Sequence, residues 1–186
     1  MHALLYPSGT NPVEIRVARD SDAEAVLALR LMLDSESEFM LLEADERSRD
    51  VEVQRRRLQG MLAPANSTVF VADVGGRLVG FLQARGGEFR RNRHVADIVL
   101  GVRHSHSGQG LARQLLEAAE EWARSVGVSR LELTVMAHNE RAHRLYLSVG
   151  FRDEGSKRES LRVRGAPVDE IVMGKLLAYS PSGSSA

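Results

Sequence analysis

An apolar segment, a glycine-containing turn and a long amphipathic pattern follow one another between residues 95 and 126. Residues 95–102 are almost continuously apolar, which is typical of a central strand buried on both faces. The segment from about 109 to 126 repeats apolar residues at helical spacing and stops at Gly127. Residues 131–135 then alternate as a strand. A strand, a crossover helix and a second strand form a right-handed unit, so these two strands are predicted to be parallel neighbours.

The order of the remaining periodic segments indicates the fold class. Alternation predicts a strand at 13–17, and a helical stripe of Val26, Leu29 and Leu33 follows it. Further elements are predicted as a helix at about 46–62, strands at 69–72 and 78–83, a short helix from Asn139, and strands at 151–162 and 168–176, joined by a turn at 165–167. The helix after Asn139 makes a second crossover, for which parallel neighbours are again predicted. Together these segments predict one α/β (α+β) domain with a mixed central sheet of about seven strands and helices on both faces.

Length and composition set the domain boundaries. The chain has 186 residues, 43% of them hydrophobic and 27% charged, as expected for one soluble globular domain at 13–177. Residues 1–12 show no periodicity and are predicted to be a flexible N-terminal arm, and the small, polar residues 178–186 a disordered tail. No apolar run approaches the length of a membrane span, and the first residues lack the pattern of a signal peptide.

Charge and cysteine content exclude several function classes. The chain has 25 basic and 25 acidic residues and only 5% aromatic residues, which argues against a nucleic-acid-binding module. It has no cysteine, which removes disulfides, thiolate zinc sites and a cysteine nucleophile. A cysteine-free chain is compatible with a reducing compartment, and we expect a cytoplasmic location.

The turn at 102–112 has the composition of an anion site. Gly108 and Gly110 allow backbone N–H groups to approach a ligand closely, and the start of the following helix adds free N–H donors and a partial positive charge. The turn is not a P-loop, because no Gly-Lys-Ser/Thr follows, and Arg113 replaces the third glycine of a dinucleotide fingerprint. The alternative is a glycine-rich helix start that binds nothing.

Two motifs in this region resemble those of the GNAT superfamily of acetyl-CoA-dependent N-acetyltransferases. The first is the pyrophosphate loop, Gln/Arg-x-x-Gly-x-Gly/Ala, which is similar to the run Ser107-Gly108-Gln109-Gly110-Leu111-Ala112. The second is Asn-x-x-Ala-x-x-Leu-Tyr-x-x-x-Gly-Phe, which matches residues 139–151. Ser107 departs from the family pattern, where Gln or Arg is usual, which affects a side-chain contact rather than the backbone cradle. The order of elements matches the family from about residue 13 to 177.

The resemblance implies acetyl-CoA as co-substrate, with no metal. Residues 107–112 would hold its pyrophosphate, and the backbone of Leu100 and Val102 would pair with the pantetheine amides. Asn139 would hydrogen-bond the pantetheine arm; as an asparagine at a helix start it also suits a cap, and the two roles are compatible. Because no cysteine is available, an amine would attack the thioester directly within a ternary complex.

Two residues are candidates for acid–base chemistry. Tyr146 lies on the apolar stripe of its helix, so it is either a core aromatic or, as the resemblance implies, the acid that protonates the leaving thiolate. Asp97 interrupts an apolar strand and is either the base that deprotonates the amine or half of an ion pair with an arginine. His94 is a weaker candidate for the base. His104 and His106 have no evident third metal ligand and are expected to be solvated loop residues.

The segment 34–52 carries eight acidic residues against Arg47 and Arg49. The resemblance implies that this segment borders the acceptor groove. An acidic wall would attract a cationic amine, and Glu43, flanked by apolar residues, is predicted to bind it; the alternative is a solvated helix surface. The acceptor is predicted to be a primary amine of a small molecule or of a protein. A non-catalytic CoA-binding sensor is the competing hypothesis, against which Asn139 and Tyr146 argue. Homodimerisation through the last two strands is a further expectation by analogy with such folds.

Overall fold

The computed structural model describes residues 12–177, which form one α/β domain built on a seven-stranded sheet. The predicted arm and tail lie outside the described residues, apart from Pro12. The elements are β1 (Val13–Val17), α1 (Ala23–Glu36), α2 (Val51–Leu62), β2 (Thr68–Val74), β3 (Arg77–Gly86), β4 (Val95–Val102), α3 (Leu111–Ser125), β5 (Arg130–Met136), α4 (Glu140–Ser148), β6 (Arg152–Val163) and β7 (Ala166–Leu176). Within residues 12–177, no helix is long and apolar enough to cross a membrane.

The strand order is β1-β2-β3-β4-β5-β7-β6, and β4 with β5 is the one parallel pair in the described sheet. The first predicted crossover, through α3, is therefore confirmed. The second prediction was wrong: β6 is not a neighbour of β5, because β7 pairs antiparallel with β5 from Arg130↔Leu176 to Met136↔Glu170. The polar strand β6, exposed over most of its length, becomes the edge of the sheet, as charged strands usually do.

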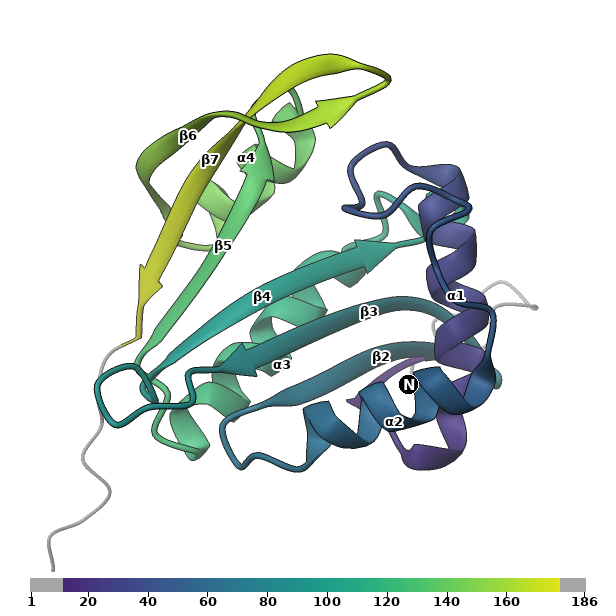
Figure 1. Ribbon diagram of the computed structural model, residues 1–186. Helices are drawn as coiled ribbons and strands as arrows, with labels where there is room; N and C mark the ends of the chain where they lie inside the picture. The colour runs from purple at the N-terminus through teal and green to yellow at the C-terminus, as the bar shows by residue number, and fades with distance from the viewer. Residues whose placement is uncertain (1–11, 178–186) are drawn as a thin grey trace, which may run out of the picture.

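The helices cover the sheet on both sides (Figure 1). Helices α1 and α2 lie over β2 and β3 and close a core that includes Leu29, Leu33 and Phe81. Helices α3 and α4 lie on the opposite face and close the larger core with Leu115, Leu131 and other apolar side chains. We call these two sides the α1/α2 face and the α3/α4 face.

Strand β4 differs from the prediction of burial on both faces. Ala96 and Ile98 are buried in the core of the α3/α4 face, whereas Asp97 and Val99 on the other face are exposed. The cause is the extent of the two layers, because α1 and α2 cover β2 and β3 and leave this part of β4 open (Figure 1). An open strip of sheet is available on the α1/α2 face, next to β5.

The connection between α1 and α2 is a separate structural unit rather than part of a helix from residue 46. Helix α2 begins at Val51 because the Asp50 side chain accepts hydrogen bonds from the N–H groups of Glu52 and Val53. The connection is anchored by Arg47, whose Nη2 donates to Asp34 Oδ1 of α1 at 3.0 Å and whose Nε bonds the other carboxylate oxygen. Both side chains are buried. This ion pair holds residues 37–50 against α1.

The turn between β6 and β7 lies at Arg164 and Gly165, one residue before the predicted turn. Both residues have positive φ, 50° and 82°, as a two-residue hairpin turn of the mirror-image type requires. The hairpin carries this turn towards the connection 37–50, where the Arg164 guanidinium lies 3.3 Å from the Glu38 carboxylate.

Candidate active site

Strands β4 and β5 pair at one end and diverge at the other. Their register holds for Val95↔Arg130, Ala96↔Leu131 and Asp97↔Glu132, and no further pair follows in the described sheet. Figure 1 shows the resulting wedge-shaped separation between the two strands. Backbone groups on the facing edges of both strands are thereby released from the sheet.

The released groups of β4 belong to its even-numbered residues. Val95 accepts from Gly87 N at 3.0 Å, and Arg103 N donates to Val79 O at 2.8 Å, so odd-numbered residues bond to β3. Because successive residues of a strand direct their backbone groups to opposite edges, Leu100 and Val102 face the gap. These are the two residues expected to pair with pantetheine amides, and the geometry suits that role.

The turn at 107–112 leads from the gap to the start of α3. Gly108 and Gly110 have φ values of 80° and 79°, a left-handed conformation that side chains rarely adopt. None of the backbone N–H groups of residues 108–113 donates to an acceptor within residues 12–177, and no side chain caps α3. Six free donors at a helix N-terminus make a cradle for an anion. The donor set therefore fits a pyrophosphate.

Arg141 is a second feature of the cradle, and the sequence analysis missed it. Its Nη2 atom lies 3.8 Å from the position that a Cβ atom on Gly108 would occupy. Arg141 is the second residue of α4 and is exposed. A guanidinium beside the free N–H groups of this turn strengthens its preference for a phosphate group. Its place two residues after Asn139, in the motif that contains the site, could have identified it.

Asn139 caps the start of α4, and Tyr146 of the same helix lies in the core of the α3/α4 face. Asn139 Oδ1 accepts from Ala142 N at 3.2 Å, so the capping role is confirmed, and its side-chain NH₂ has no partner in the described part of the chain. Tyr146 is 8% exposed and meets Phe151 edge-on at 5.8 Å. Burial raises the pKa of Tyr146 to about 12. The phenol therefore holds its proton. Within residues 12–177 its hydroxyl makes no hydrogen bond to another protein group, and the hydroxyl oxygen itself is not completely buried.

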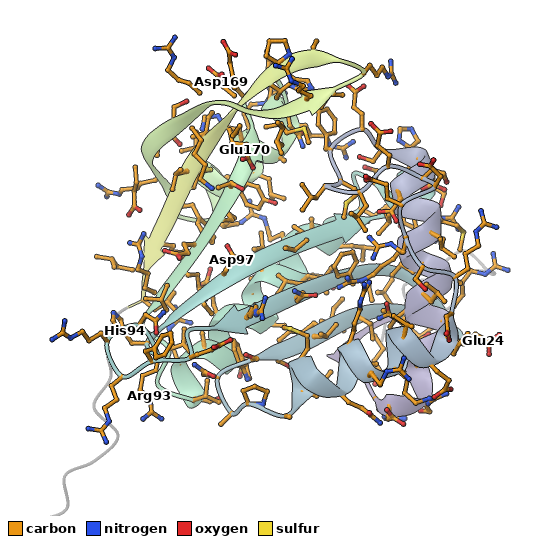
Figure 2. The ribbon with its side chains drawn as sticks, in the orientation of Figure 1. Glu24, Arg93, His94, Asp97, Asp169 and Glu170 are labelled. Atoms are coloured by element: carbon orange, nitrogen blue, oxygen red, sulfur yellow. The ribbon has the colours of Figure 1, made fainter. Side chains whose placement is uncertain are left out.

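Asp97 lies at the last paired position of β4, beside the gap (Figure 2). Desolvation by its surroundings and the nearby Glu132 carboxylate raise its pKa, against the opposing charges of Lys157 and Arg85. The expected alternative was an ion pair, and no such pair forms in the described structure. Arg85 faces Asp97 across β3 and β4, but its nearest carboxylate is that of Glu88 at 4.0 Å. Asp97 is therefore an unpaired carboxylate with a raised pKa next to the separated strands.

The other candidate residues lie apart from this centre. His94 precedes β4 and is exposed at the paired end of β4 and β5 (Figure 2). His104 and His106 form a short 3₁₀ turn, and within residues 12–177 no group of three or more potential metal ligands occurs. Glu43 is exposed in the connection between α1 and α2, where its N–H donates to the Glu46 carboxylate at 2.9 Å.

Several acidic side chains of the segment 34–52 form hydrogen bonds or ion pairs with other elements of the protein. Glu36 accepts from Arg103 Nε at 3.0 Å and from His104 N at 3.1 Å, which lowers the pKa of its carboxyl and ties α1 to the end of β4. Glu38 lies 3.8 Å from His138 Nε2 and 3.3 Å from Arg164. Phe39 stacks against His138 with ring centroids 5.2 Å apart. Residues 38–39 therefore reach across to the start of α4 and to the β6–β7 turn, a contact that no local sequence pattern indicates.

Comparisons with known proteins identify relatives of the chain. The profile of the acetyltransferase (GNAT) family matches residues 30–151, more than half of the chain. The chain is 32% identical over 110 residues to the L-amino acid N-acetyltransferase AaaT of Escherichia coli (strain K12), covering 57% of this chain and 66% of that protein. It is 36% identical over 109 residues to the N-alpha-acetyltransferase RimI of Mycobacterium tuberculosis (strain ATCC 25618 / H37Rv), covering 56% and 65%. The chain spans just under two thirds of each of these relatives.

Solved structures share the fold. An acetyltransferase of the GNAT family from Streptococcus pneumoniae superposes with a TM-score of 0.86 at 29% identity, covering 90% of this chain and 100% of that one. The yncA structure from Salmonella typhimurium, solved with its cofactor acetyl-CoA, has a TM-score of 0.81 at 19% identity, covering 95% and 100%. With the divergent strands, the anion cradle and the family profile together, the chain belongs to the GNAT family of acetyltransferases.

Proposed function

We propose that this protein transfers the acetyl group of acetyl-CoA to a primary amine, by direct attack of the amine within a ternary complex. The observation that carries the proposal is the divergence of β4 and β5 beside a cradle of six free N–H groups at 108–113. Acetyl-CoA supplies the thioester that the amine attacks. The chain has no cysteine to form a thioester of its own, which supports direct transfer.

Binding of acetyl-CoA is assigned to backbone groups more than to side chains. Within the loop 107–112, the free N–H groups from Gly108 onward would hold the pyrophosphate together with the Arg141 guanidinium, whereas the Ser107 N–H already donates to His104 O. The gap-facing backbone of Leu100 and Val102 would hold the pantetheine amides, and the free NH₂ of Asn139 would add one bond. The absence of Gln or Arg at Ser107 is compatible with this scheme, because the cradle consists of main-chain donors.

Asp97 would act as the general base. An amine is nucleophilic only when neutral, so the proton of the incoming ammonium must be removed near the thioester. Asp97 is unpaired, lies at the point of divergence and has a raised pKa, which makes its carboxylate a stronger proton acceptor than an ordinary aspartate. It would take the proton directly or through a water molecule.

Tyr146 would act as the general acid on the opposite side of the gap. Its buried phenol stays protonated at neutral pH and lacks a protein partner, so it is free to donate to the sulfur as the carbon–sulfur bond breaks. The N–H groups of β4 that face the gap are available to the developing negative charge on the carbonyl oxygen. Asp97 would thereby accept the proton of the attacking amine, and Tyr146 would donate a proton to the leaving sulfur.

The acceptor would approach from the α1/α2 face, where β4 is open to solvent. The names of the two curated relatives point to amino acids in one case and to α-amines of proteins in the other, and a primary amine is common to both. Glu43 is proposed to help collect the ammonium form of the acceptor, since it is exposed in the connection beside this face and makes no ion pair within residues 12–177.

A screen of amine acceptors that measures CoA release tests the proposed activity. We expect CoA release that depends on both acetyl-CoA and an amine, with a product heavier than the amine by one acetyl group. The competing sensor hypothesis predicts that acetyl-CoA raises the melting temperature while no amine, peptide or protein acceptor stimulates CoA release. That pattern would contradict the proposal.

A further inference from the structure

Arg30 is a half-buried cation that forms no ion pair within residues 12–177. It belongs to α1, and its guanidinium carbon lies 4.5 Å from the centre of the Phe81 ring. Its Nη2 donates to the neutral Gln83 Oε1 at 2.7 Å. Its Nε is the only buried side-chain polar atom in residues 12–177 that lacks a hydrogen-bond partner. Burial lowers the pKa of Arg30 to about 10, with further contributions from the positive charges of Arg47 and Arg57.

No neighbouring carboxylate neutralises this charge. Asp34 is the acidic residue near Arg30, but both of its oxygens accept from Arg47. The group of Arg30, Asp34 and Arg47 therefore carries one excess positive charge under the helices. Buried charges are normally paired, because removing a charge from water is costly. An anionic ligand that binds beside such a cation would supply the missing negative charge.

A small cavity adjoins Arg30, and its polar lining consists mainly of N–H donors. About 20 Å³ in volume, it is lined by polar side chains from α1, α2 and β3, namely Arg30, Gln54, Arg57 and Gln83, with apolar residues around them. Within residues 12–177 the Gln54 side chain and the NH₂ of Gln83 form no hydrogen bond, and these atoms keep some exposure. This volume accepts one oxygen-sized group. A water would satisfy the donors and leave the charge, whereas an anionic oxygen would satisfy both.

The cavity ends one strand away from the open strip that carries Asp97, because its lining includes Gln83 of β3 and no residue of β4. Gln83 pairs in register with Val99, and Arg85 pairs with Asp97. Residues two apart on one strand face are about 7 Å apart along the strand. The Arg30 guanidinium, bound to Gln83, is thus one such step from the level of the proposed base. Val99 between them is 38% exposed, so a ligand can lie across it.

We propose that Arg30, with Gln54 and Gln83, binds the carboxylate of the acceptor, so that the acceptor is a zwitterion of the amino-acid class whose amine lies at Asp97. This inference rests on the proposed acetyl transfer and deepens it. The carboxylate places one oxygen in the cavity, and the single carbon that joins the carboxylate to the amine lies near Val99. The amine and the carboxylate then occupy sites of opposite charge at the spacing that the strand sets.

The first test compares α-amino acids with their α-carboxamides, which keep the side chain and the amine and remove the negative charge. After correction for the fraction of neutral amine, we expect the wild-type kcat/KM to favour the acid at least 10-fold. In Arg30→Gln the preference should fall about 10-fold or more, with the carboxamide rate and the KM for acetyl-CoA unchanged. Arg30→Lys should retain part of the preference. Arg56→Gln, an exposed neighbour on α2, serves as the matched control.

Two outcomes of this comparison would overturn the inference. One is a wild-type enzyme that uses carboxamides as well as acids. The other is an Arg30→Gln variant that loses both activities to the same degree, which would indicate a packing role. If no amine stimulates CoA release, the proposed function itself fails. The anion site at Arg30 is then tested by ligand binding and by stability.

Binding and stability give readouts that need no turnover. In the presence of CoA, an N-acetylated amino acid should raise the melting temperature of the wild type and leave that of Arg30→Gln unchanged. Arg30→Met should melt no lower than the wild type without ligand, since it removes an uncompensated buried charge and keeps a similar volume. A clear drop in the melting temperature of Arg30→Met, or an equal product shift in Arg30→Gln, would contradict an anion site at Arg30.

Discussion

Asp97 lies beside the separation of β4 and β5 on the α1/α2 face, and Tyr146 lies in the core of the α3/α4 face. We propose that each handles a different proton of the transfer. Partial desolvation beside Glu132 raises the pKa of Asp97, while full burial raises that of Tyr146. Both shifts favour the protonated form. The carboxyl starts from a much lower ordinary pKa than the phenol and ionises at the lower pH of the two, whereas the phenol keeps its proton at neutral pH.

The pH–rate profile tests Asp97. If it is the base, activity should rise as its carboxyl ionises, at a pH above the ordinary aspartate range of about 4. Asp97→Asn should lower kcat and remove this acidic limb. A profile with the same limb in the variant would assign the limb to another group.

Asp97→Asn should also change stability in a defined direction. A carboxyl whose pKa is raised in the folded state favours folding while it is protonated, and this contribution is lost as pH rises through the folded-state pKa. At neutral pH the wild type therefore carries a charge that the fold disfavours. Urea unfolding at neutral pH should show Asp97→Asn to be at least as stable as the wild type, with the difference shrinking at acidic pH.

Tyr146→Phe tests the general acid. We expect kcat to fall about 10- to 1,000-fold, the scale of lost acid assistance, while the melting shift with acetyl-CoA is retained. The variant should fold normally, because the hydroxyl has no protein partner to lose within residues 12–177. An unchanged kcat would show that Tyr146 is not the general acid and serves only as a core aromatic residue.

The residues named from sequence were those with a local signal, and those missed had none or a weak one. Tyr146 and Asn139 stand in a recognisable motif, and Asp97 interrupts an apolar run. Arg30 also interrupts an apolar helical stripe, between Val26 and Leu33, and could have been noticed for the same reason. The contact of Glu38 with Arg164 joins positions far apart in the chain, so it depends on the sheet order and was not accessible.

At the scale of elements, the predictions succeeded where periodicity was long and failed where pairing was long-range. Helix α3 and its parallel crossover follow from one continuous pattern. The insertion of β7 between β5 and β6 does not, although the nearly complete polarity of 152–160 is typical of an edge strand and could have suggested it. The start of α2 was placed about five residues too early, because the cap that begins the helix is Asp50.

The connection between α1 and α2 should depend on the buried Asp34–Arg47 pair. Arg47→Met leaves a buried carboxylate without its partner and should lower the free energy of unfolding by about 3–5 kcal/mol, as measured by urea denaturation. The double variant Asp34→Leu, Arg47→Met should recover most of this loss, since it removes both charges. If the two changes are instead additive, the pair does not act as a unit.

At the scale of the whole molecule, two layers of helices leave two openings on one sheet. The α3/α4 side offers the anion cradle at the start of α3, and the α1/α2 side offers the open strip of β4. The wedge between β4 and β5 connects them. A co-substrate and an acceptor can therefore meet from opposite sides of the sheet. The expected homodimer and cytoplasmic location remain predictions at this scale.

Calorimetric titration of acetyl-CoA into the wild type, Gly110→Asp and Gly110→Ala tests the central claim most directly. Both variants bear the same unfavourable φ of 79°, and a Cβ there meets only Gln114 at 3.9 Å, so Gly110→Ala controls for backbone strain. The aspartate adds a negative charge and an acceptor that competes for the free N–H groups. The account predicts binding in the wild type, weakened but measurable binding in Gly110→Ala, and none in Gly110→Asp. Equal affinity in Gly110→Asp and Gly110→Ala would show that acetyl-CoA does not use this cradle.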